Sequence, residues 1–283
     1  MQGQIYKLHS NFYTIKCEDK FYTCGARGVL KIKSDGLCVG DYVEFDGKAI
    51  TKVFDRKNRF IRPSVANIDT VVIIISPAPA PDFYLIDKLI LNSVKEDVEI
   101  IILVNKTDVD QTIIDKIKDE YKALNVNILP ICVYENKGVD EIKELLKGKL
   151  SVLAGQSAVG KTSLINLLFG LNNKTGELSD KIVRGKHTTT RSEIFEKDGV
   201  KLIDSPGFAV IDANVSLEEL PECYPEYLDV ANQCKFRGCT HTSEPSCKVK
   251  ELVEKGILSK DRYERYTEIY EQVSKRRVIY EKN

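Results

Sequence analysis

The first part of the chain contains short segments in which β-branched and aromatic residues alternate with polar ones. Three of them cover residues 12–16, 20–24 and 41–45, and turn-forming pairs such as Asp46-Gly47 separate such segments. About five short strands in roughly 60 residues predict a small closed or nearly closed β-barrel, of which the OB-fold is one kind. The strand count alone does not separate it from an SH3-like barrel.

The pattern changes after Pro63, which biases its neighbour away from helix. Longer apolar runs, of the kind found in strands buried on both faces, then alternate with amphipathic stretches of helical period. The runs cover residues 70–76, 99–104, 126–132, 150–154 and 200–203, and the stretches cover residues 84–94 and 112–124. We therefore predict a barrel over residues 1–62 and an α/β domain with a mainly parallel sheet over residues 63–213.

Beyond residue 213 the strand pattern stops. Ser216 and Glu219 have the spacing of a capping box, which predicts a short helix, and a longer helix is predicted from about residue 259. One face of that longer helix carries Tyr263, Tyr266, Tyr270 and Val273, a grouping more typical of packing than of ligand binding. Residues 214–283 are thus predicted to form a mainly helical module.

The formal net charge is zero, which excludes a chain-wide polycation. Residues 1–62 are nevertheless basic, because Lys and Arg outnumber Asp and Glu there by 12 to 7. This favours a polyanionic partner, although a solvated basic face explains the charge equally well. No apolar run approaches the ~20 residues of a membrane helix, and the first residues lack the apolar stretch of a secretory signal. We expect a cytoplasmic protein whose eight cysteines are reduced thiols or metal ligands.

Residues 155–162 match the phosphate-binding pattern G-x-x-x-x-G-K-[ST] without a mismatch, between a predicted strand and a predicted helix. In such a loop the glycines let backbone amides surround the phosphates, Lys161 neutralises the β- and γ-phosphates, and the Thr162 hydroxyl ligates Mg²⁺. A glycine-containing turn with a chance lysine is the alternative, and the strand-turn-helix context makes it weak. The predicted nucleotide-binding residues of this loop are Gly155, Gln156, Ser157, Ala158, Val159, Gly160, Lys161, Thr162 and Ser163.

A phosphate loop does not distinguish ATP from GTP, and Asn105, Lys106, Thr107 and Asp108 supply that distinction. An ionised carboxylate only accepts hydrogen bonds, so Asp108 suits the N1–H and exocyclic amine of guanine. Adenine presents an acceptor at N1, which would leave buried polar groups unsatisfied. Asn105 would brace the loop, and the stem of Lys106 would cover the base. These four residues are weak evidence alone and strong evidence beside a phosphate loop.

Asp204 follows the predicted strand over residues 200–203 and begins the sequence Asp-Ser-Pro-Gly. There it could hold a water on the Mg²⁺, and the Gly207 amide could meet the γ-phosphate; a plain Pro-Gly turn is the alternative. In the polar segment before it, Thr189 or Thr190 would complete the Mg²⁺ shell, as in a switch ordered by γ-phosphate. A polar loop without function would have the same composition.

Three cysteines and one of only three histidines fall within 14 residues near the end of the chain. Three thiolates and one imidazole suit tetrahedral Zn²⁺, and a closed four-ligand shell favours a structural role over a catalytic one. Free buried thiols are the alternative, which this clustering disfavours, and the absence of C-x-x-C argues against a redox role. The predicted zinc ligands are Cys234, Cys239, His241 and Cys247.

The motifs occur in an unusual order. In familiar small GTPases the phosphate loop comes first and the guanine-reading motif late, whereas here the guanine-reading motif precedes the phosphate loop, the switch threonines and Asp204. A circular permutation gives this order and leaves the site intact if the strands keep their positions. The segment after Gly207 then runs directly into the C-terminal module. We hypothesise that switch movement reaches that module, which hydrogen exchange would test.

With these motifs in place, the whole chain resembles the ribosome small-subunit-dependent GTPase A family. The resemblance rests on the four zinc ligands and on residues 105–108, 155–163, 185–190 and 204–208. It implies an OB-fold, a circularly permuted GTPase domain and a zinc-binding module in a chain that we expect to be monomeric. It also implies binding to the small ribosomal subunit, a late role in its maturation, and faster GTP hydrolysis on the subunit. Ser205 replaces the usual Thr, and Cys132 replaces a Ser that supports guanine, so Cys132 is assigned no role.

Phe208 stands where many GTPases place a water-orienting Gln, and a phenyl ring cannot orient water. His187 is the candidate for orienting the water, and an exposed loop residue without function is the alternative. Lys161 and Asp204 would position groups and neutralise charge during in-line attack of water on the γ-phosphate. The basic residues expected to contact ribosomal RNA are Arg27, Lys31, Lys33, Arg56, Lys57 and Arg59, with residues 275–277 as a further contact or a solvated run. The competing classes are an RNA-binding scaffold that uses GTP only as a conformational ligand and an ATP-driven enzyme.

Overall fold

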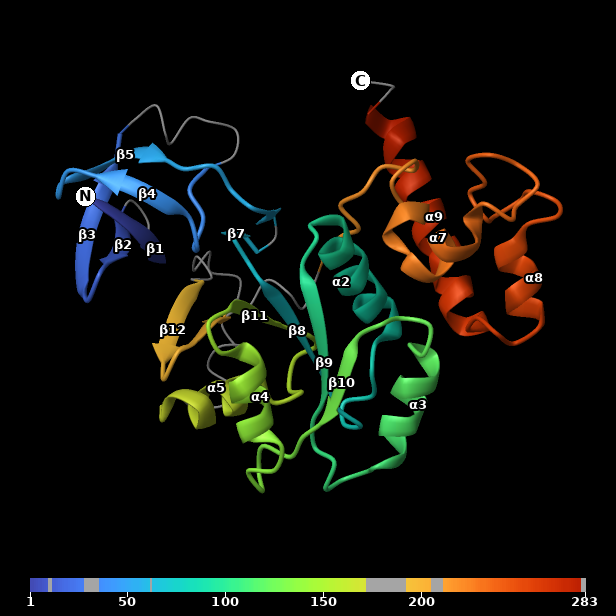
Figure 1. Cartoon of the computed structure of the whole chain (residues 1–283), viewed down its shortest axis with the longest axis horizontal. Coiled ribbons are helices and arrows are strands. Elements are labelled where there is room, and N and C mark those ends of the chain that lie inside the picture. Colours follow the sequence, from blue (N-terminus) through green and yellow to red (C-terminus); the bar gives the residue numbers. More distant parts are fainter. Residues whose placement is uncertain (10–11, 28–35, 62, 172–191, 205–210, 281–283) are drawn as a thin grey trace.

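The computed structural model describes residues 1–9, 12–27, 36–61, 63–171, 192–204 and 211–280, with side chains placed up to residue 276 (Figure 1). Several residues singled out above lie outside the described residues. They are Lys31, Lys33, His187, Thr189, Thr190, Ser205, Gly207, Phe208 and the side chain of Arg277.

The N-terminal part is a five-stranded β-barrel, as predicted. Its strands are β1 (Gln2–His9), β2 (Phe12–Cys17), β3 (Lys20–Ala26), β4 (Tyr42–Phe45) and β5 (Ala49–Val53). They lie in the order β1-β2-β3-β5-β4, and β4 pairs back onto β1, which closes the barrel. Alternation places Ile5, Ile15, Val43, Phe45 and Ile50 inside, each at most 1% exposed. Glu44, between Val43 and Phe45, is exposed.

The central part is an α/β domain whose parallel strands follow the predicted runs. They are β8 (Thr70–Ile75), β9 (Glu99–Val104), β10 (Asn127–Pro130), β11 (Leu150–Ala154) and β13 (Val200–Asp204), in the order β10-β9-β8-β11-β13. Beside β13 runs the antiparallel strand β12 (Glu193–Lys197). Because β8, β9, β11 and β13 are parallel and in register, their carboxyl ends meet at one edge of the sheet. The predicted nucleotide motifs lie at or directly after the ends of β9, β11 and β13.

Helices cover both faces of this sheet (Figure 1). The helices are α2 (Phe83–Lys95), α3 (Thr112–Glu120), α4 (Val139–Leu146) and α5 (Lys161–Phe169). Alternate residues of β8 point to opposite cores: Val71 and Ile73 pack with α2 and α3, whereas Val72 and Ile74 pack with α4 and α5. The strands are therefore apolar on both faces, which is why their sequences are continuous apolar runs.

The barrel and the central sheet are joined by strand pairing. Lys7 of β1 lies opposite Glu193 of β12, so that the two sheets form one continuous sheet of eleven strands. Glu196 of β12 accepts hydrogen bonds from Tyr6 and Lys16 of the barrel. A short hairpin of β6 (Arg59–Phe60) and β7 (Val65–Ala66) connects the two parts along the chain. The junction is thus held by side chains as well as by backbone pairing.

The C-terminal part is helical, as predicted, with the 3₁₀ helix η2 (Pro221–Cys223) and the helices α7 (Pro225–Ala231), α8 (Lys248–Glu254) and α9 (Lys260–Tyr280). Ser216 and Glu219 exchange the two hydrogen bonds of a capping box. The residues after this box form a turn and a 3₁₀ helix rather than the expected α-helix, because Pro221 has no N–H to continue one. Tyr266, Ile269 and Val273 of α9 are buried in the core of this part. Within the described residues, no helix is long and apolar enough to cross a membrane.

Candidate functional site

The turn after β11 has the shape that a phosphate loop requires. Gly155 has φ +129°, and a Cβ there would lie 2.4 Å from the Ile74 carbonyl oxygen. Gly160 has φ +105°, and a Cβ there would lie 2.2 Å from Asn105 Nδ2. Only glycine tolerates both the positive φ and the close approach of neighbouring atoms to the position of a Cβ. This steric restriction explains why the motif requires glycine at these two positions. The loop ends at Lys161, the first residue of α5.

Lys161 folds back over this loop. Its Nζ donates to the carbonyl oxygens of Gly155, at 2.8 Å, and Gln156. Burial lowers the pKa of Lys161 to about 8, and the carboxylate of Asp204 partly opposes that shift. Burial likewise raises the pKa of Asp204, which lies at the end of β13 beside β11, and Lys161 lowers it. A phosphate that met Lys161 Nζ would favour its charged form.

The predicted guanine-reading residues touch the phosphate loop, although some 50 positions separate the two motifs. Asn105 is 3% exposed, and its Nδ2 donates to the Val159 carbonyl oxygen at 2.8 Å. Its Oδ1 accepts from the Val133 amide at 3.2 Å. Lys106 Nζ donates to the Ala158 carbonyl oxygen at 2.8 Å. Asn105 therefore braces two loops against each other.

Asp108, the last of the guanine-reading residues, is held in place by the residues directly after β10. Thr107 Oγ1 donates to the Ile131 carbonyl oxygen at 3.0 Å, which fixes the backbone next to Asp108. The thiol of Cys132 donates to Asp108 Oδ1 at 3.1 Å. Asp108 itself is exposed.

The segment after β8 is a part of this region that the sequence motifs did not indicate. Gln156 of the phosphate loop bridges to it: its Oε1 accepts from the Asp82 amide at 2.9 Å, and its Nε2 donates to the Ala80 carbonyl oxygen at 3.1 Å. Lys106 Nζ also donates to the Ala78 carbonyl oxygen. The sequence signal was a Pro- and Ala-rich run, residues 77–81, directly after a buried strand.

The four predicted metal ligands converge. The ligand atoms of Cys234, Cys239, His241 and Cys247 all lie within 4.8 Å of one another, and His241 Nδ1 is 3.3 Å from Cys247 Sγ. Three of the four side chains are buried, and Cys234 is half-buried. Separations of this size suit atoms that share one tetrahedral ion at 2.0–2.3 Å. The residues present thus fit a metal ion of the thiolate- and imidazole-binding kind.

The loop between these ligands is held by Glu244. Its carboxylate accepts from the Thr240 amide and hydroxyl, both at 2.7 Å, and from the Thr242 amide at 3.1 Å. Burial alone would raise the pKa of Glu244, but these hydrogen bonds lower it to about 2. Glu244 therefore stays ionised and fixes the backbone on both sides of His241. Sequence analysis missed this residue because it is not itself a ligand.

The basic residues expected to meet RNA have different surroundings. Arg56 donates to buried Asp41 at 2.7 Å, so this guanidinium holds the barrel together. Lys57 pairs with Asp69 at 3.0 Å, and exposed Arg27 lies 3.6 Å from Asp46. Lys57 and Arg27 are more than half exposed, which leaves them accessible to a further anion. At the end of α9, Lys275 is also exposed and pairs with Glu271, and Arg276 pairs with Asp212.

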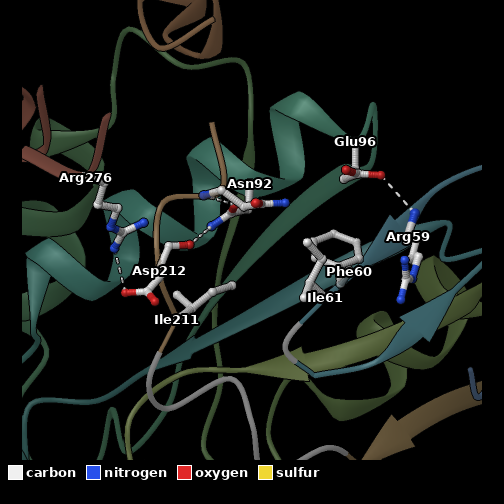
Figure 2. Close-up of a pocket in the computed structure, with 9 residues that line it drawn as sticks. Arg59, Phe60, Ile61, Asn92, Glu96, Ile211, Asp212 and Arg276 are labelled. Carbon is white, nitrogen blue, oxygen red and sulfur yellow. Dashed lines mark hydrogen bonds and ion pairs between the residues drawn. The ribbon is translucent and has the colours of Figure 1, made fainter. Parts of the chain in front are cut away.

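A cavity of about 270 Å³ lies elsewhere, where the three parts of the chain meet (Figure 2). Its walls are residues 59–61, Asn92 and Glu96 of α2, Arg276 of α9, and residues 211, 212 and 214. Figure 2 shows Arg276 directed at Asp212 and Glu96 at the backbone of Arg59. Among its described lining residues, none belongs to the predicted nucleotide motifs.

Comparison with known proteins gives a consistent result along the whole chain. The sequence model of the RsgA GTPase matches residues 53–214, and that of the RsgA N-terminal domain matches residues 2–52. Small ribosomal subunit biogenesis GTPase RsgA of Geobacillus sp. (strain WCH70) is 36% identical over 99% of both chains. The Streptococcus pneumoniae protein of the same name is 36% identical over 100% of this chain and 98% of its own.

Two solved structures share the fold. YjeQ from Thermotoga maritima matches with a TM-score of 0.79 and 32% identity, over 96% of this chain and 98% of its own. YloQ, a circularly permuted GTPase, matches with a TM-score of 0.76 and 29% identity, over 97% and 95%. The permuted motif order predicted from the sequence is thereby confirmed. Sequence, fold and motif order agree, and the chain belongs to the RsgA GTPase family.

Proposed function

We propose that this protein binds the small ribosomal subunit, assists its late maturation and hydrolyses GTP to GDP and phosphate with stimulation by the subunit. The observation that carries the proposal is the direct contact between the two nucleotide motifs, in which Asn105 and Lys106 bond to Val159 and Ala158. This contact brings the guanine-reading residues and the phosphate loop together, so that one nucleotide could meet both. The relatives that match the full chain are small ribosomal subunit biogenesis GTPases.

At this site Asp108 would accept the N1–H and exocyclic amine of guanine, and the stem of Lys106 would cover the base. Backbone amides of residues 155–163 would surround the phosphates at the start of α5. Thr107 supports this site because its hydroxyl donates to the carbonyl oxygen of Ile131, directly after β10. Mg²⁺, held by Thr162, would neutralise charge on the β- and γ-phosphates.

Hydrolysis requires a water oxygen to bond to the γ-phosphorus while the bond to the β–γ bridging oxygen breaks. Lys161 would stabilise the charge that develops on the phosphates, and Asp204 would orient a metal-bound water. His187 is our candidate for orienting the attacking water. Thr189 or Thr190 and the Gly207 amide are our candidates for sensing the γ-phosphate. These four residues are proposed from the sequence alone.

The Cys₃His cluster would hold one structural Zn²⁺, because four protein ligands leave no open position for a substrate. The barrel would bind ribosomal RNA through its exposed basic residues, of which Arg27 and Lys57 are described. We place the protein in the cytoplasm as a monomer. We also propose the domain limits 1–62, 63–213 and 214–283.

Multiple-turnover phosphate release from GTP, with and without purified small subunits, tests the proposal. We expect turnover that rises on addition of subunits, and preference for GTP over ATP in competition. Asp108→Asn should weaken GTP binding by about 100-fold or more, because it replaces the acceptor that guanine needs. Asp140→Asn is the matched control, since Asp140 is an exposed carboxylate of α4. Binding of GTP without turnover on subunits would favour the RNA-binding scaffold instead.

A further inference from the structure

The barrel and the nucleotide site meet in one row of residues that crosses three strands. Lys7 of β1 lies opposite Glu193 of β12, and Glu193 lies opposite Asp204 of β13. Residues directly opposite each other in an antiparallel pair point to the same face of the sheet, with Cβ atoms about 4.5–5.5 Å apart. The three side chains therefore lie next to one another on one face.

This face is the one that α5 covers. Leu202, two residues before Asp204, and Phe195, two residues after Glu193, pack in the core that the sheet shares with α4 and α5. Residues two apart on a strand share a face, so Glu193 and Asp204 lie on the face of α5, whose first residue is Lys161. The row thus leads from the barrel to the helix that follows the phosphate loop.

Two negative charges stand in the middle of this row. Glu193 and Asp204 are like charges directly opposite each other, an arrangement that is destabilising unless cations balance it. Lys7 Nζ lies 2.5 Å from Glu193 Oε2, so the barrel supplies one of the balancing cations. Burial raises the pKa of Asp204, Lys161 on the other side lowers it, and Glu193 raises it. Asp204 is therefore sensitive to whether Glu193 keeps its partner.

We propose that Lys7 and Glu193 couple the barrel to the nucleotide site: Lys7 exchanges between Glu193 and a phosphate of RNA bound to the barrel, and Glu193 transmits that exchange to Asp204. The inference rests on the proposed function, in which the barrel binds RNA and Asp204 orients a metal-bound water. It goes beyond that function by naming two residues through which RNA and nucleotide change each other's affinity.

The ion pair is accessible to such a phosphate, because the side chain of Lys7 is 28% exposed and that of Glu193 is 37% exposed. A phosphate accepts charge-assisted hydrogen bonds from lysine, as a carboxylate does. Once Lys7 pairs with RNA, Glu193 is left as an unbalanced negative charge directly opposite Asp204. By reciprocity, a nucleotide that changes the charge around Asp204 changes how strongly Glu193 holds Lys7, and hence the affinity for RNA.

A second ion pair of the same junction provides a matched control. Lys16 of β2 pairs with Glu196 of β12, also at 2.5 Å, and these side chains are 23% and 27% exposed. Glu196, however, lies opposite Lys201, and on the other face of β12 from Glu193. Lys16→Met thus loosens the junction without leaving an unbalanced charge opposite Asp204.

The test measures, by co-sedimentation, the affinity of the full chain for purified small ribosomal subunits with a non-hydrolysable GTP analogue and with GDP. In the wild type the ratio of these two affinities should differ from one by at least about fivefold. Lys7→Met and Glu193→Gln should each bring the ratio about three- to fivefold closer to one. The double variant should go at most about twofold further, because the two residues act as a pair. Lys7→Arg, which keeps the charge, and Lys16→Met should keep the ratio within about twofold of the wild type.

Lys7→Met and Glu193→Gln variants that keep the ratio of the wild type would overturn the inference and leave the proposed function intact, as would a wild type that binds subunits equally with both nucleotides. A Lys16→Met variant that lowers the ratio as much as Lys7→Met would assign the effect to loosening of the junction, and would likewise overturn the inference. A wild-type protein that does not bind small subunits with either nucleotide would overturn both.

Discussion

Replacing Arg262 with methionine should loosen the contact between α9 and the GTPase domain. Arg262 belongs to a charged cluster of five side chains, together with Asp87 of α2, Glu120 of α3, Glu226 of α7 and Arg265 of α9. The guanidinium of Arg262 is 4% exposed and donates to both Asp87 and Glu226. Burial alone would lower the pKa of Arg262, but these two carboxylates raise it well above its ordinary value.

The free-energy cost of Arg262→Met depends on which charged groups lose their partners. Asp87 would keep Arg265 as a partner, whereas Glu226, 3% exposed, would lose the ion pair that it makes within the described part of the chain. Two unit charges 4 Å apart interact by about 4 kcal/mol at an effective dielectric constant of 20, and Arg262 has two such partners. Part of that energy offsets the desolvation of the ions, so that breaking a buried pair costs about 3–5 kcal/mol. At about 1.4 kcal/mol per factor of ten, opening of α9 should become roughly 10²- to 4 × 10³-fold more frequent.

Hydrogen exchange of the backbone amides of α9, under native conditions, measures this opening. Lys260→Met is the matched control on the same helix, because its pair with Glu264 is largely exposed, and it should change exchange by at most about threefold. Adding Glu226→Gln to Arg262→Met should restore about tenfold of the protection, since it removes the stranded charge. Exchange in Arg262→Met equal to that in Lys260→Met would refute the reasoning, as would a double variant that is no better protected than the single one.

Three further outcomes are expected. Because burial lowers the pKa of Lys161 to about 8 and a bound phosphate would raise it, nucleotide binding should take up protons near and above pH 8, and affinity should fall as the pH rises. Calorimetry in two buffers of different ionisation enthalpy measures that uptake, which Lys161→Arg should abolish. If the Cys₃His cluster holds a metal ion as proposed, its removal by a chelator should make Cys239 and its neighbours react with a thiol reagent, while guanine nucleotide still binds. Gly40→Ala should lower the melting temperature more than Gly36→Ala, since both have positive φ but only a Cβ at Gly40 would meet backbone, 2.0 Å from the Ala66 carbonyl oxygen.

Helices and strands could be predicted where the hydrophobic pattern of a segment shows which of its faces are buried. The run at residues 70–76 is apolar at every position from Val71 to Ile75 because both faces of β8 are covered, and the predicted strand at residues 150–154 matches β11 at both ends. The pairing of β1 with β12 was not predictable, because it joins Lys7 to Glu193 across two domains. Alternation along a strand indicates which face is buried but contains no information about its edge partners.

The same distinction holds in the site. The glycines and Lys161 of the phosphate loop could be recognised because all residues of this motif are consecutive in the sequence. The bonds from Cys132 to Asp108 and from Gln156 to the segment after β8 join residues far apart in sequence. The sequence marks Cys132 only as a replacement for the usual Ser and Gln156 only as a residue of the phosphate loop, and it does not indicate which partners their side chains have. Their role becomes visible only once the carboxyl ends of β8, β9 and β11 are seen at one edge.

These long-range contacts also offer a path by which a change in the nucleotide site could reach the C-terminal module. The hypothesis from the sequence used only the chain that continues past Gly207, but α2 offers a second path. Gln156 of the phosphate loop bonds to Asp82 at the start of α2, and Asp87, one turn further, lies in the charged cluster. Near the end of the helix, Asn92 bonds to the backbone of the segment that leads from β13 into the module. Because α2 is a single helix of 13 residues, about 20 Å long, we expect a shift of the phosphate loop that moves Asp82 to act on both of these contacts as well.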